Sequence, residues 1–214
     1  LTVCAGLTTS LADATAGGTW TSSNPAQGSV VPATNVTIAG VSAGTTTISY
    51  SLSTGCFRTT VVTVNPLPAA ITGTAFVCVG LTTNLSNATG TGVWSSSNTA
   101  QATIGSTTGV VTGVGAGNPV VNYTLATGCL QSVTLTVNPL PASIGGTFTA
   151  CPGTTATLTN ATSGGVWISN NTAVATIGSS TGTFTGVSAG TTTVTYTLPT
   201  GCMGTTTITI NPNP

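Results

Sequence analysis

The chain is almost devoid of ionisable side chains. Its 214 residues include no His, a single cation, Arg58, and a single anion, Asp13, so only 1% of residues are charged and the formal net charge is zero. General acid–base catalysis draws mostly on His, carboxylates and Lys, so we expect no catalytic residues and no enzyme. Metal sites need clustered His, Cys or carboxylates, and nucleic-acid binding needs several cations. We therefore expect no metal, no cofactor and no nucleic-acid partner.

Long apolar runs are also missing. Thr, Ser, Gly and Asn interrupt every apolar stretch before it reaches 18 residues, so neither a transmembrane helix nor membrane insertion of this segment is predicted. No initiating Met and no signal segment is visible, which suggests a mature or excised portion of a longer protein. Hydrophobic residues still make up 39% of the chain. That content is enough for a core, and disorder is not expected.

The sequence repeats three times with a period of 73 or 74 residues. Two sets of cysteines, a Trp, a Tyr and an Asn-Pro pair recur in step. A repeat of this length is larger than a solenoid unit of roughly 20–50 residues and matches a small domain. We predict three tandem domains, 1–66, 67–139 and 140–214, the first of which lacks the opening strand segment. The recurring cysteines are Cys4, Cys78 and Cys151 in one set, and Cys56, Cys129 and Cys202 in the other.

Each repeat has the pattern of β-structure. Apolar and polar residues alternate strictly in 48–52 (ISYSL), 121–125 (VNYTL) and 194–198 (VTYTL), which indicates strands with one buried face. Thr, the most abundant residue, fills many outward positions and suits a pleated surface. No segment has helical periodicity. Six or seven short strands per repeat predict an all-β chain of three β-sandwiches without significant helix.

The predicted linkers are short and rich in proline. Residues 65–68 and 138–141 both read NPLP. Each Pro fixes its own φ and pushes the preceding residue toward extended geometry. Such linkers behave as semi-rigid spacers, so we expect the three sandwiches to form a rod.

Several motifs resemble the bacterial immunoglobulin-like domain of group 2. In the second repeat they are GVWSSSN at 92–98, ATI at 102–104 and TGVVTGV at 108–114, and the other two repeats carry the same series. The resemblance implies immunoglobulin-like sandwiches and a role similar to the stalks of surface adhesins of the intimin and invasin type. Members of that family commonly lack paired cysteines and carry an ordinary charged surface. Both departures point to a more specialised assembly.

The cysteines predict disulfides and therefore an oxidising, extracellular compartment. Repeat symmetry favours one bond within each domain, and in an immunoglobulin-like sandwich the opening strand can lie beside the closing one. The favoured pairs are Cys4–Cys56, Cys78–Cys129 and Cys151–Cys202. A rival arrangement, Cys56–Cys78 with Cys129–Cys151, crosses the linkers and leaves Cys4 and Cys202 free to join neighbouring molecules.

The recurring aromatic residues have a structural and a functional interpretation. A row of tryptophans can bind carbohydrate, but a Trp at the same strand position of every repeat is more typical of a sandwich core. The tyrosines alternate in phase with apolar residues, so we expect them to face inward. The predicted core anchors are Trp20, Trp94, Trp167, Tyr50, Tyr123 and Tyr196.

The two charged residues occupy positions that are uncharged in the other repeats. Asp13 aligns with Asn87 and Asn160, so we expect it to cap a turn, and Arg58 aligns with Gln131. An exposed pair between Asp13 and Arg58 would add little stability. Covalent glycans are a further possibility, on Ser and Thr or at the sequons that begin at Asn35, Asn84, Asn87, Asn122, Asn160 and Asn170.

A nearly uncharged surface favours association, and edge strands here lack the Lys that usually protects them. We expect a non-enzymatic structural protein of the bacterial cell surface, a fibre subunit or adhesin stalk, whose partners are copies of itself. The alternative is an adhesive binding module for a glycan, ice or a host surface. The first repeat lacks the segment that opens the others, so a neighbouring molecule is a possible donor of a strand at that edge.

Overall fold

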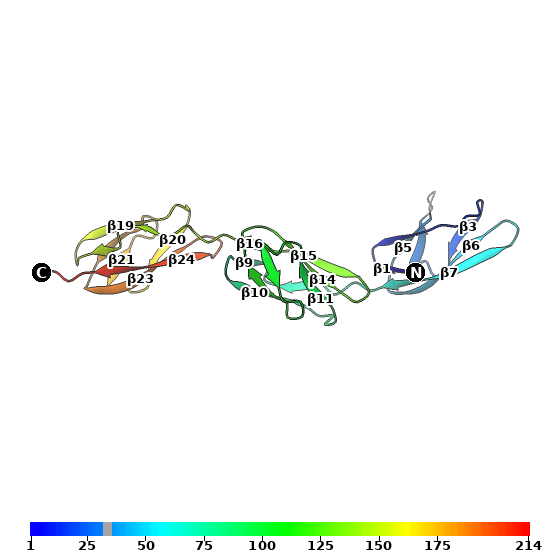
Figure 1. The fold of residues 1–214 in the computed structure, drawn as a ribbon, viewed down its shortest axis with the longest axis horizontal. Helices are drawn as coiled ribbons and strands as arrows, with labels where there is room; N and C mark the ends of the chain where they lie inside the picture. The colour runs from blue at the N-terminus through cyan, green and yellow to red at the C-terminus, as the bar shows by residue number, and fades with distance from the viewer. Residues whose placement is uncertain (32–35) are drawn as a thin grey trace.

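The computed structural model describes residues 1–31 and 36–214, and these contain 24 strands and no helix. The strands form three β-sandwiches that follow one another along the long axis of the molecule (Figure 1). Each sheet and each hydrophobic core draws its residues from one predicted repeat only. The chain is therefore all-β, with three tandem immunoglobulin-like sandwiches, as the alternating pattern predicts.

The first sandwich contains two sheets. One has the order β1-β7-β6-β3 and the other the order β2-β5-β4. The opening strand β1 runs parallel to the closing strand β7, and all other pairs in this sandwich are antiparallel. The strands are β1 (Thr2–Cys4), β2 (Thr8–Leu11), β3 (Thr19–Ser22), β4 (Gly28–Val31), β5 (Val36–Gly40), β6 (Gly44–Ser51) and β7 (Phe57–Asn65).

The second sandwich repeats this topology with one added strand. Its sheets have the orders β12-β13-β10-β8 and β11-β14-β15, and β16 continues β15 and pairs in parallel with β9. The added strand β8 pairs antiparallel with β10. The strands are β8 (Ile71–Gly73), β9 (Phe76–Cys78), β10 (Thr82–Asn87), β11 (Val93–Ser96), β12 (Ala102–Ile104), β13 (Val110–Gly113), β14 (Val120–Thr124), β15 (Leu130–Thr134) and β16 (Thr136–Asn138).

The third sandwich has two four-stranded sheets, β17-β19-β22-β21 and β18-β24-β23-β20. Its β17 corresponds to β8 of the second sandwich and pairs with β19. The strands are β17 (Gly145–Gly146), β18 (Thr149–Ala150), β19 (Thr155–Thr159), β20 (Val166–Ser169), β21 (Ala175–Ile177), β22 (Thr183–Gly186), β23 (Gly190–Thr197) and β24 (Met203–Ile210).

The predicted alternation is visible in the burial of the long strands. In β23, side chains from Thr192 to Tyr196 alternate between buried and half-buried, and β6 has the same pattern. Apolar side chains on one face enter the core, while Thr covers the other face. Period-two alternation of this kind specifies the register, because a slip of one residue would turn every apolar side chain outward.

A Trp–Tyr pair lies in each sandwich. The ring centroids are 4.6 Å apart for Trp20–Tyr50, 4.7 Å for Trp94–Tyr123 and 4.5 Å for Trp167–Tyr196. The Trp and Tyr side chains of the second and third sandwiches are buried, as is Tyr50. Trp20 is only half-buried and packs at the margin of the first core.

The first sandwich lacks a counterpart of β8 and β17. In the second and third sandwiches, Ile71 and Ile144 from this segment pack against the core. In the described part of the first sandwich, β2 pairs on one side with β5 and has no strand on its other side. This edge borders an open cavity of about 140 Å³ lined by Leu11, Trp20 and Ile48 among others. Donation of a strand by a neighbouring molecule remains a prediction.

Candidate functional site: the disulfide-bonded junctions

The first cysteine of each repeat lies at the pole of its sandwich that faces the next repeat. Parallel pairing of β1 with β7 places Cys4 beside Asn65, the last residue of β7 before the linker. The same pairing places Cys78 beside Asn138. In the third sandwich Asn211 N donates to the carbonyl of Ala150, so Cys151 stands beside the end of β24 in the same way.

The second cysteine of each repeat closes a tight hairpin at the opposite pole. In the hairpin between β6 and β7, Leu52 N donates to the carbonyl of Cys56 at 2.9 Å. Gly55 adopts a φ of 87°, a left-handed conformation that Gly accepts without a steric cost. The hairpins that end in Cys129 and Cys202 have the same closing bond, from Leu125 N and Leu198 N at 2.8 Å.

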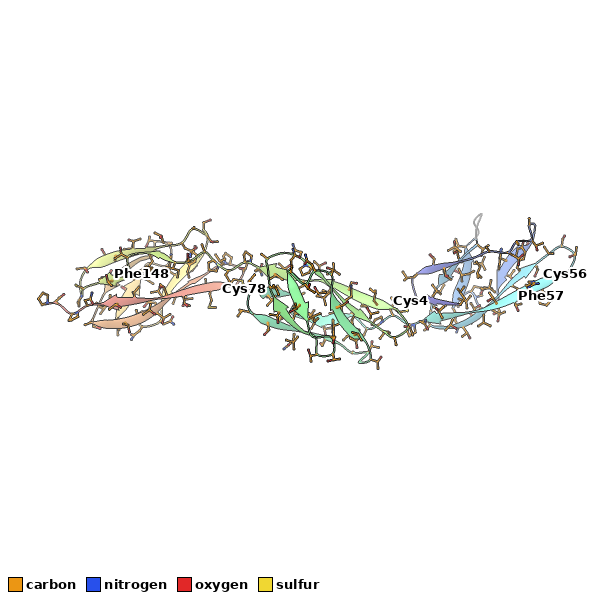
Figure 2. The ribbon with its side chains drawn as sticks, viewed as in Figure 1. Cys4, Cys56, Phe57, Cys78 and Phe148 are labelled. Carbon is orange, nitrogen blue, oxygen red and sulfur yellow. A yellow bond between two sulfur atoms is a disulfide. The ribbon has the colours of Figure 1, made fainter. Side chains whose placement is uncertain are left out.

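Two disulfides join consecutive sandwiches across these poles. Cys4 bonds to Cys129 and Cys78 bonds to Cys202, with Cα–Cα distances of 5.6 and 5.7 Å, within the usual range for disulfides. Cys4 and Cys78 lie at the two junctions in Figure 2. Each bond therefore ties the end of one sandwich to the hairpin of the following sandwich.

The disulfide pairing predicted from repeat symmetry is wrong. Cys4–Cys56, Cys78–Cys129 and Cys151–Cys202 would each join the two poles of one sandwich. Strand β7 separates the hairpin at Cys56 from the residue beside Cys4, and a strand of this length spans about 30 Å at roughly 3.3 Å per residue. A disulfide tolerates a Cα–Cα separation of at most about 7 Å.

The rival arrangement is also wrong, although bonds across the linkers do occur. It paired Cys56 with Cys78 and Cys129 with Cys151, whereas the structure pairs the first cysteine of one repeat with the second cysteine of the next. All six cysteines lie in the described part of the chain, and there Cys56 and Cys151 are the two without a partner. Cys56 is exposed at the outer pole of the first sandwich (Figure 2). Cys151 is partly exposed beside the end of β24, at the pole of the third sandwich near residue 214.

The linkers pack against the sandwich that follows them. Pro68 and Pro141, the second prolines of the two linkers, are buried. Pro141 lies so close to Gly204 in β24 that a Cβ on this Gly would be 3.3 Å from the proline Cγ. At the same junction Thr200 and Gly201 of the third sandwich share a groove with Phe76 and Cys78 of the second. The junction is therefore packed as well as covalently closed.

Hydrogen bonds fix the residue after each buried proline. Ala69 N donates to Thr89 Oγ1 at 2.8 Å, and Asn87 Nδ2 donates to the carbonyl of Ala69. Ala142 makes the same two bonds to Thr162 and Asn160 in the third sandwich. At Asn87 and Asn160 the amide nitrogen that would carry an N-linked glycan is engaged with the linker. The sequon at Asn35 lies outside the described residues.

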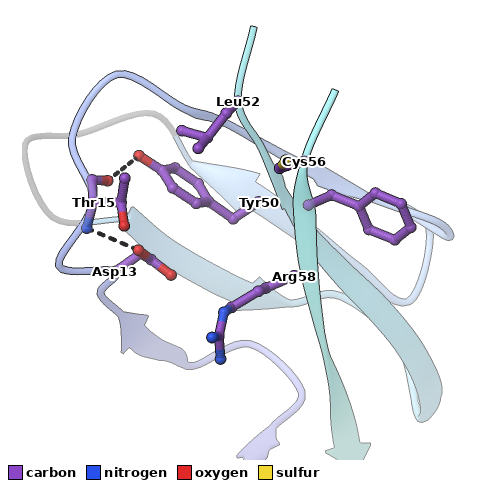
Figure 3. Close-up of a pocket in the computed structure, with 7 residues that line it drawn as sticks. Asp13, Thr15, Tyr50, Leu52, Cys56 and Arg58 are labelled. Carbon is purple, nitrogen blue, oxygen red and sulfur yellow. Dashed lines mark hydrogen bonds between the residues drawn. The ribbon is translucent and has the colours of Figure 1, made fainter. Parts of the chain in front are cut away.

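The corresponding position in the first sandwich is an open pocket. It has a volume of about 130 Å³ and is lined by Asp13, Thr15, Tyr50, Leu52, Cys56, Phe57 and Arg58. Asp13 Oδ1 accepts a hydrogen bond from Thr15 N at 2.9 Å (Figure 3), so it caps a turn as predicted. Arg58 lines the same pocket, and among the described residues no ion pair forms between it and Asp13.

The only two charged side chains of the chain thus lie where the other sandwiches receive a linker. Asp13 takes the place of Asn87 and Asn160, and Thr15 that of Thr89 and Thr162. Sequence comparison of the repeats aligned these positions but gave no reason to connect them with the linkers. The signal was present in the composition, since both charges fall in the same repeat, at the positions that bind a linker in the other two.

Two further properties concern the described residues as a whole. No helix in residues 1–31 or 36–214 is long and apolar enough to cross a membrane. Over the same ranges no three Cys or acidic residues gather into a group that could hold a metal ion.

Comparison with known proteins gives likenesses of fold only. No family model matches the chain, and no curated protein matches it. Among solved structures, domains 1–6 of the surface layer protein SbsC are similar over 100% of this chain and 39% of that one, with 15% identity and a TM-score of 0.32. This chain therefore spans well under half of that surface layer fragment.

Two other solved structures come from intimin and a cadherin. A C-terminal fragment of intimin in complex with the intimin-binding domain of its translocated receptor is similar over 79% of this chain and 57% of that one, with 17% identity and a TM-score of 0.34. The EC22–24 domains of mouse cadherin-23 are similar over 99% of this chain and 94% of that one, with 13% identity and a TM-score of 0.29.

Proposed function

We propose that this chain is a non-enzymatic structural protein of the extracellular surface, a rod of stapled immunoglobulin-like sandwiches that serves as a fibre subunit or adhesin stalk. The observation that carries the proposal is the disulfide at each junction, Cys4–Cys129 and Cys78–Cys202. Bonds of this kind persist in oxidising compartments outside the cell. Their position between sandwiches opposes bending and separation of the units, which is a mechanical role.

The surface of the rod supports association with copies of itself. Strands β3, β11 and β20 form outer edges of their sheets, and an unpaired edge is a template for pairing with another chain. Val93 on β11 and Val166 and Ile168 on β20 are exposed, the last with 54% of its surface accessible. With one cation and one anion on the whole chain, no charge repels a second copy at these edges.

A binding module for a glycan, ice or a host surface is the alternative function. Hollows of about 360 and 490 Å³ lie beside Trp20 and Trp167, within the roughly 300–1,000 Å³ of ordinary ligand sites, whereas the pocket beside Asp13 and Arg58 has only about 130 Å³. Its counterparts in the other sandwiches receive the linkers. The structural function therefore accounts for the pocket without an external ligand.

Sedimentation of a variant without the two unpaired thiols tests self-association. We expect Cys56→Ser/Cys151→Ser, which retains both internal disulfides, to form non-covalent assemblies whose size increases with concentration in the absence of glycans. Adding Ile168→Lys at the β20 edge should weaken association about tenfold, equivalent to ~1.4 kcal/mol. Thr195→Lys, on strand β23, which is paired there with β20 on one side and β24 on the other, adds the same charge away from any edge and should have a smaller effect.

Two results would contradict the proposal. The first is a variant that stays monomeric at the highest soluble concentration. The second is that both Lys substitutions weaken self-association equally. That result would mean that net charge, and not the strand edge, controls association.

A further inference from the structure

The two unpaired cysteines are the two halves of a junction that occurs twice within the chain. Cys151 is the third member of the series that begins with Cys4 and Cys78, and Cys56 is the first member of the series that continues with Cys129 and Cys202. In both internal junctions a member of the first series bonds to a member of the second. Cys151 and Cys56 lie at the opposite outer ends of the molecule.

The backbone around Cys151 shares two contacts with the backbones of the bonded cysteines of its series. Thr154 N donates to the carbonyl of Cys151 at 3.0 Å, as Leu7 N does to Cys4 and Leu81 N to Cys78 at the same distance. Gly186 lies so close that a Cβ would be 2.5 Å from the carbonyl oxygen of Cys151, and the glycines that face Cys4 and Cys78 are similarly close, at 2.7 Å. One contact differs: Pro152 has no N–H, whereas Ala5 and Val79 donate theirs to Asn65 and Asn138 at the bonded poles.

The hairpin around Cys56 is in the bonded conformation, since its closing hydrogen bond and its left-handed Gly55 match those of the Cys129 and Cys202 hairpins. The difference lies in what covers the sulfur. Cys129 and Cys202 are each 1% exposed, and their Sγ atoms lie 4.0 and 3.9 Å from the carbonyl oxygens of Asn65 and Asn138 in the preceding sandwich. Cys56 is exposed, and in residues 1–31 and 36–214 no other sandwich covers it.

The first sandwich also has an open pocket at the position where the other two sandwiches bind the linker that precedes them. The pocket beside Tyr50 and Arg58 (Figure 3) occupies the position where the other sandwiches hold Pro68 or Pro141 and the residue that follows it. The chain ends with residues 211–214, NPNP, which match the NPLP linkers at three of four positions, including the proline that is buried at each junction.

We propose that copies of this chain join head to tail through a disulfide from Cys151 of one copy to Cys56 of the next. Residues 211–214 of the first copy then lie in the pocket beside Arg58 of the second copy. The proposal rests on the structural function above and specifies the longitudinal contact of the fibre. The occupant of each pole is a second copy, because the contact continues an interface that the chain already forms twice within itself.

Formation of the bond requires a two-electron oxidant, for which a small-molecule disulfide such as oxidised glutathione suffices. The thiolate of one cysteine attacks this disulfide, which forms a mixed disulfide and releases one reduced thiol. The thiolate of the second cysteine then attacks the protein sulfur of the mixed disulfide and releases the other thiol. Two protein thiols and one oxidant disulfide thus become one protein disulfide and two small thiols.

Non-reducing electrophoresis after incubation with oxidised glutathione tests the proposal. We expect a ladder of covalent multimers that lengthens with protein concentration, because between copies no linker raises the effective concentration. A peptide containing Cys56 bonded to Cys151 should appear on mass spectrometry. Neither Cys56→Ser nor Cys151→Ser alone should form a ladder, whereas an equal mixture of the two should give a dimer that contains one copy of each.

A displaced thiol is the matched control for docking. Cys56→Ser/Phe57→Cys places the thiol one residue further along β7, at a position that is 68% exposed in the parent chain. If the hairpin conformation and the pocket hold Cys56 in position to bond with Cys151 of another copy, this variant should form multimers at least tenfold more slowly than the parent. An equal rate would show that exposure alone governs the bond and would overturn the proposal.

Two other results overturn it. The first is the absence of a ladder although both thiols have reacted with glutathione, and the second is a product limited to Cys56–Cys56 and Cys151–Cys151 dimers. Failure here is distinguishable from failure of the proposed function, because the Cys56→Ser/Cys151→Ser variant reports non-covalent association separately.

Discussion

At the scale of single residues, the tyrosine of each repeat connects the core to the loop above it. Tyr196 packs against Trp167, accepts a hydrogen bond from Gly165 N at 2.8 Å and donates one to the carbonyl of Thr162 at 2.7 Å. Gly165 is required by this approach, since a Cβ there would lie 2.4 Å from the tyrosine ring. The hydroxyl thus satisfies two backbone groups that the loop leaves unpaired.

Removal of this hydroxyl should measurably destabilise the third sandwich. We expect Tyr196→Phe to lower the free energy of unfolding by about 1–2 kcal/mol, because two partly buried backbone groups lose their partner. Denaturant unfolding followed by Trp fluorescence would measure the change. Thr193→Val removes a half-exposed hydroxyl from the same strand, on the face away from the core, and should change stability by no more than about 0.5 kcal/mol. An equal loss would show that the hydroxyl of Tyr196 has no special role.

At the scale of elements, the sandwiches differ in one strand. The segments that contain β8 and β17 bring Ile71 and Ile144 to the cores of the second and third sandwiches, and the first sandwich has an open edge at β2 and a half-buried Trp20 in the same place. Apolar side chains left uncovered lose both burial and dispersion contacts. The first sandwich should therefore be the least stable of the three.

Supplying the missing strand should stabilise the first sandwich. We expect a chain extended before Leu1 by the sequence of residues 66–74, PLPAAITGT, to unfold with a free energy higher by about 1–3 kcal/mol, the contribution of one buried aliphatic side chain. Differential scanning calorimetry would detect this as an upward shift of the first transition, by about 4–8 °C per kcal/mol.

The same extension with Ser in place of its Ile is the control and should give little of this gain. In the extended chain, Asp13→Asn should add further stability, because the amides of Asn87 and Asn160 donate to the linker carbonyl and a carboxylate has no proton to donate. A gain that is the same with Ile and with Ser would contradict pairing of the strand with the core.

At the scale of the whole molecule, the disulfides determine how the sandwiches move relative to one another. Each junction has two covalent connections, a linker and a disulfide, which leave one sandwich from paired residues, Asn65 beside Cys4 and Asn138 beside Cys78. A single Pro-rich linker behaves as a semi-rigid spacer, and a second connection should restrict bending further. We therefore expect the three sandwiches to move as one unit.

Loss of the disulfide between the first two sandwiches should make their junction more flexible. We expect Cys4→Ser/Cys129→Ser to broaden the distribution of end-to-end distances, measured by small-angle scattering or by energy transfer between labels on the outer sandwiches. Since the bond joins residues 125 positions apart, its removal should also cost about 4–5 kcal/mol of stability against complete unfolding on the loop-entropy estimate. An unchanged distance distribution would mean that the linker contact alone holds the junction.

The sequence by itself determined the class of fold. Alternation in segments such as 194–198 predicts strands and their buried faces, the recurrence of Trp and Tyr predicts three equivalent cores, and the near absence of charge leaves few side chains for acid–base chemistry. These properties are local or periodic, so they can be recognised in the sequence without knowing which strands are neighbours in the fold.

Only the tertiary structure decided the disulfides and the role of the two charged residues. Repeat symmetry is satisfied equally by a bond within one repeat and by a bond to the next, so the sequence alone could not choose between them. The choice follows from the parallel pairing of β1 with β7, which places Cys4 a full strand length from Cys56 and next to the hairpin of the following sandwich. Contacts between residues so distant in sequence depend on how whole strands are laid side by side, and no local pattern encodes that arrangement.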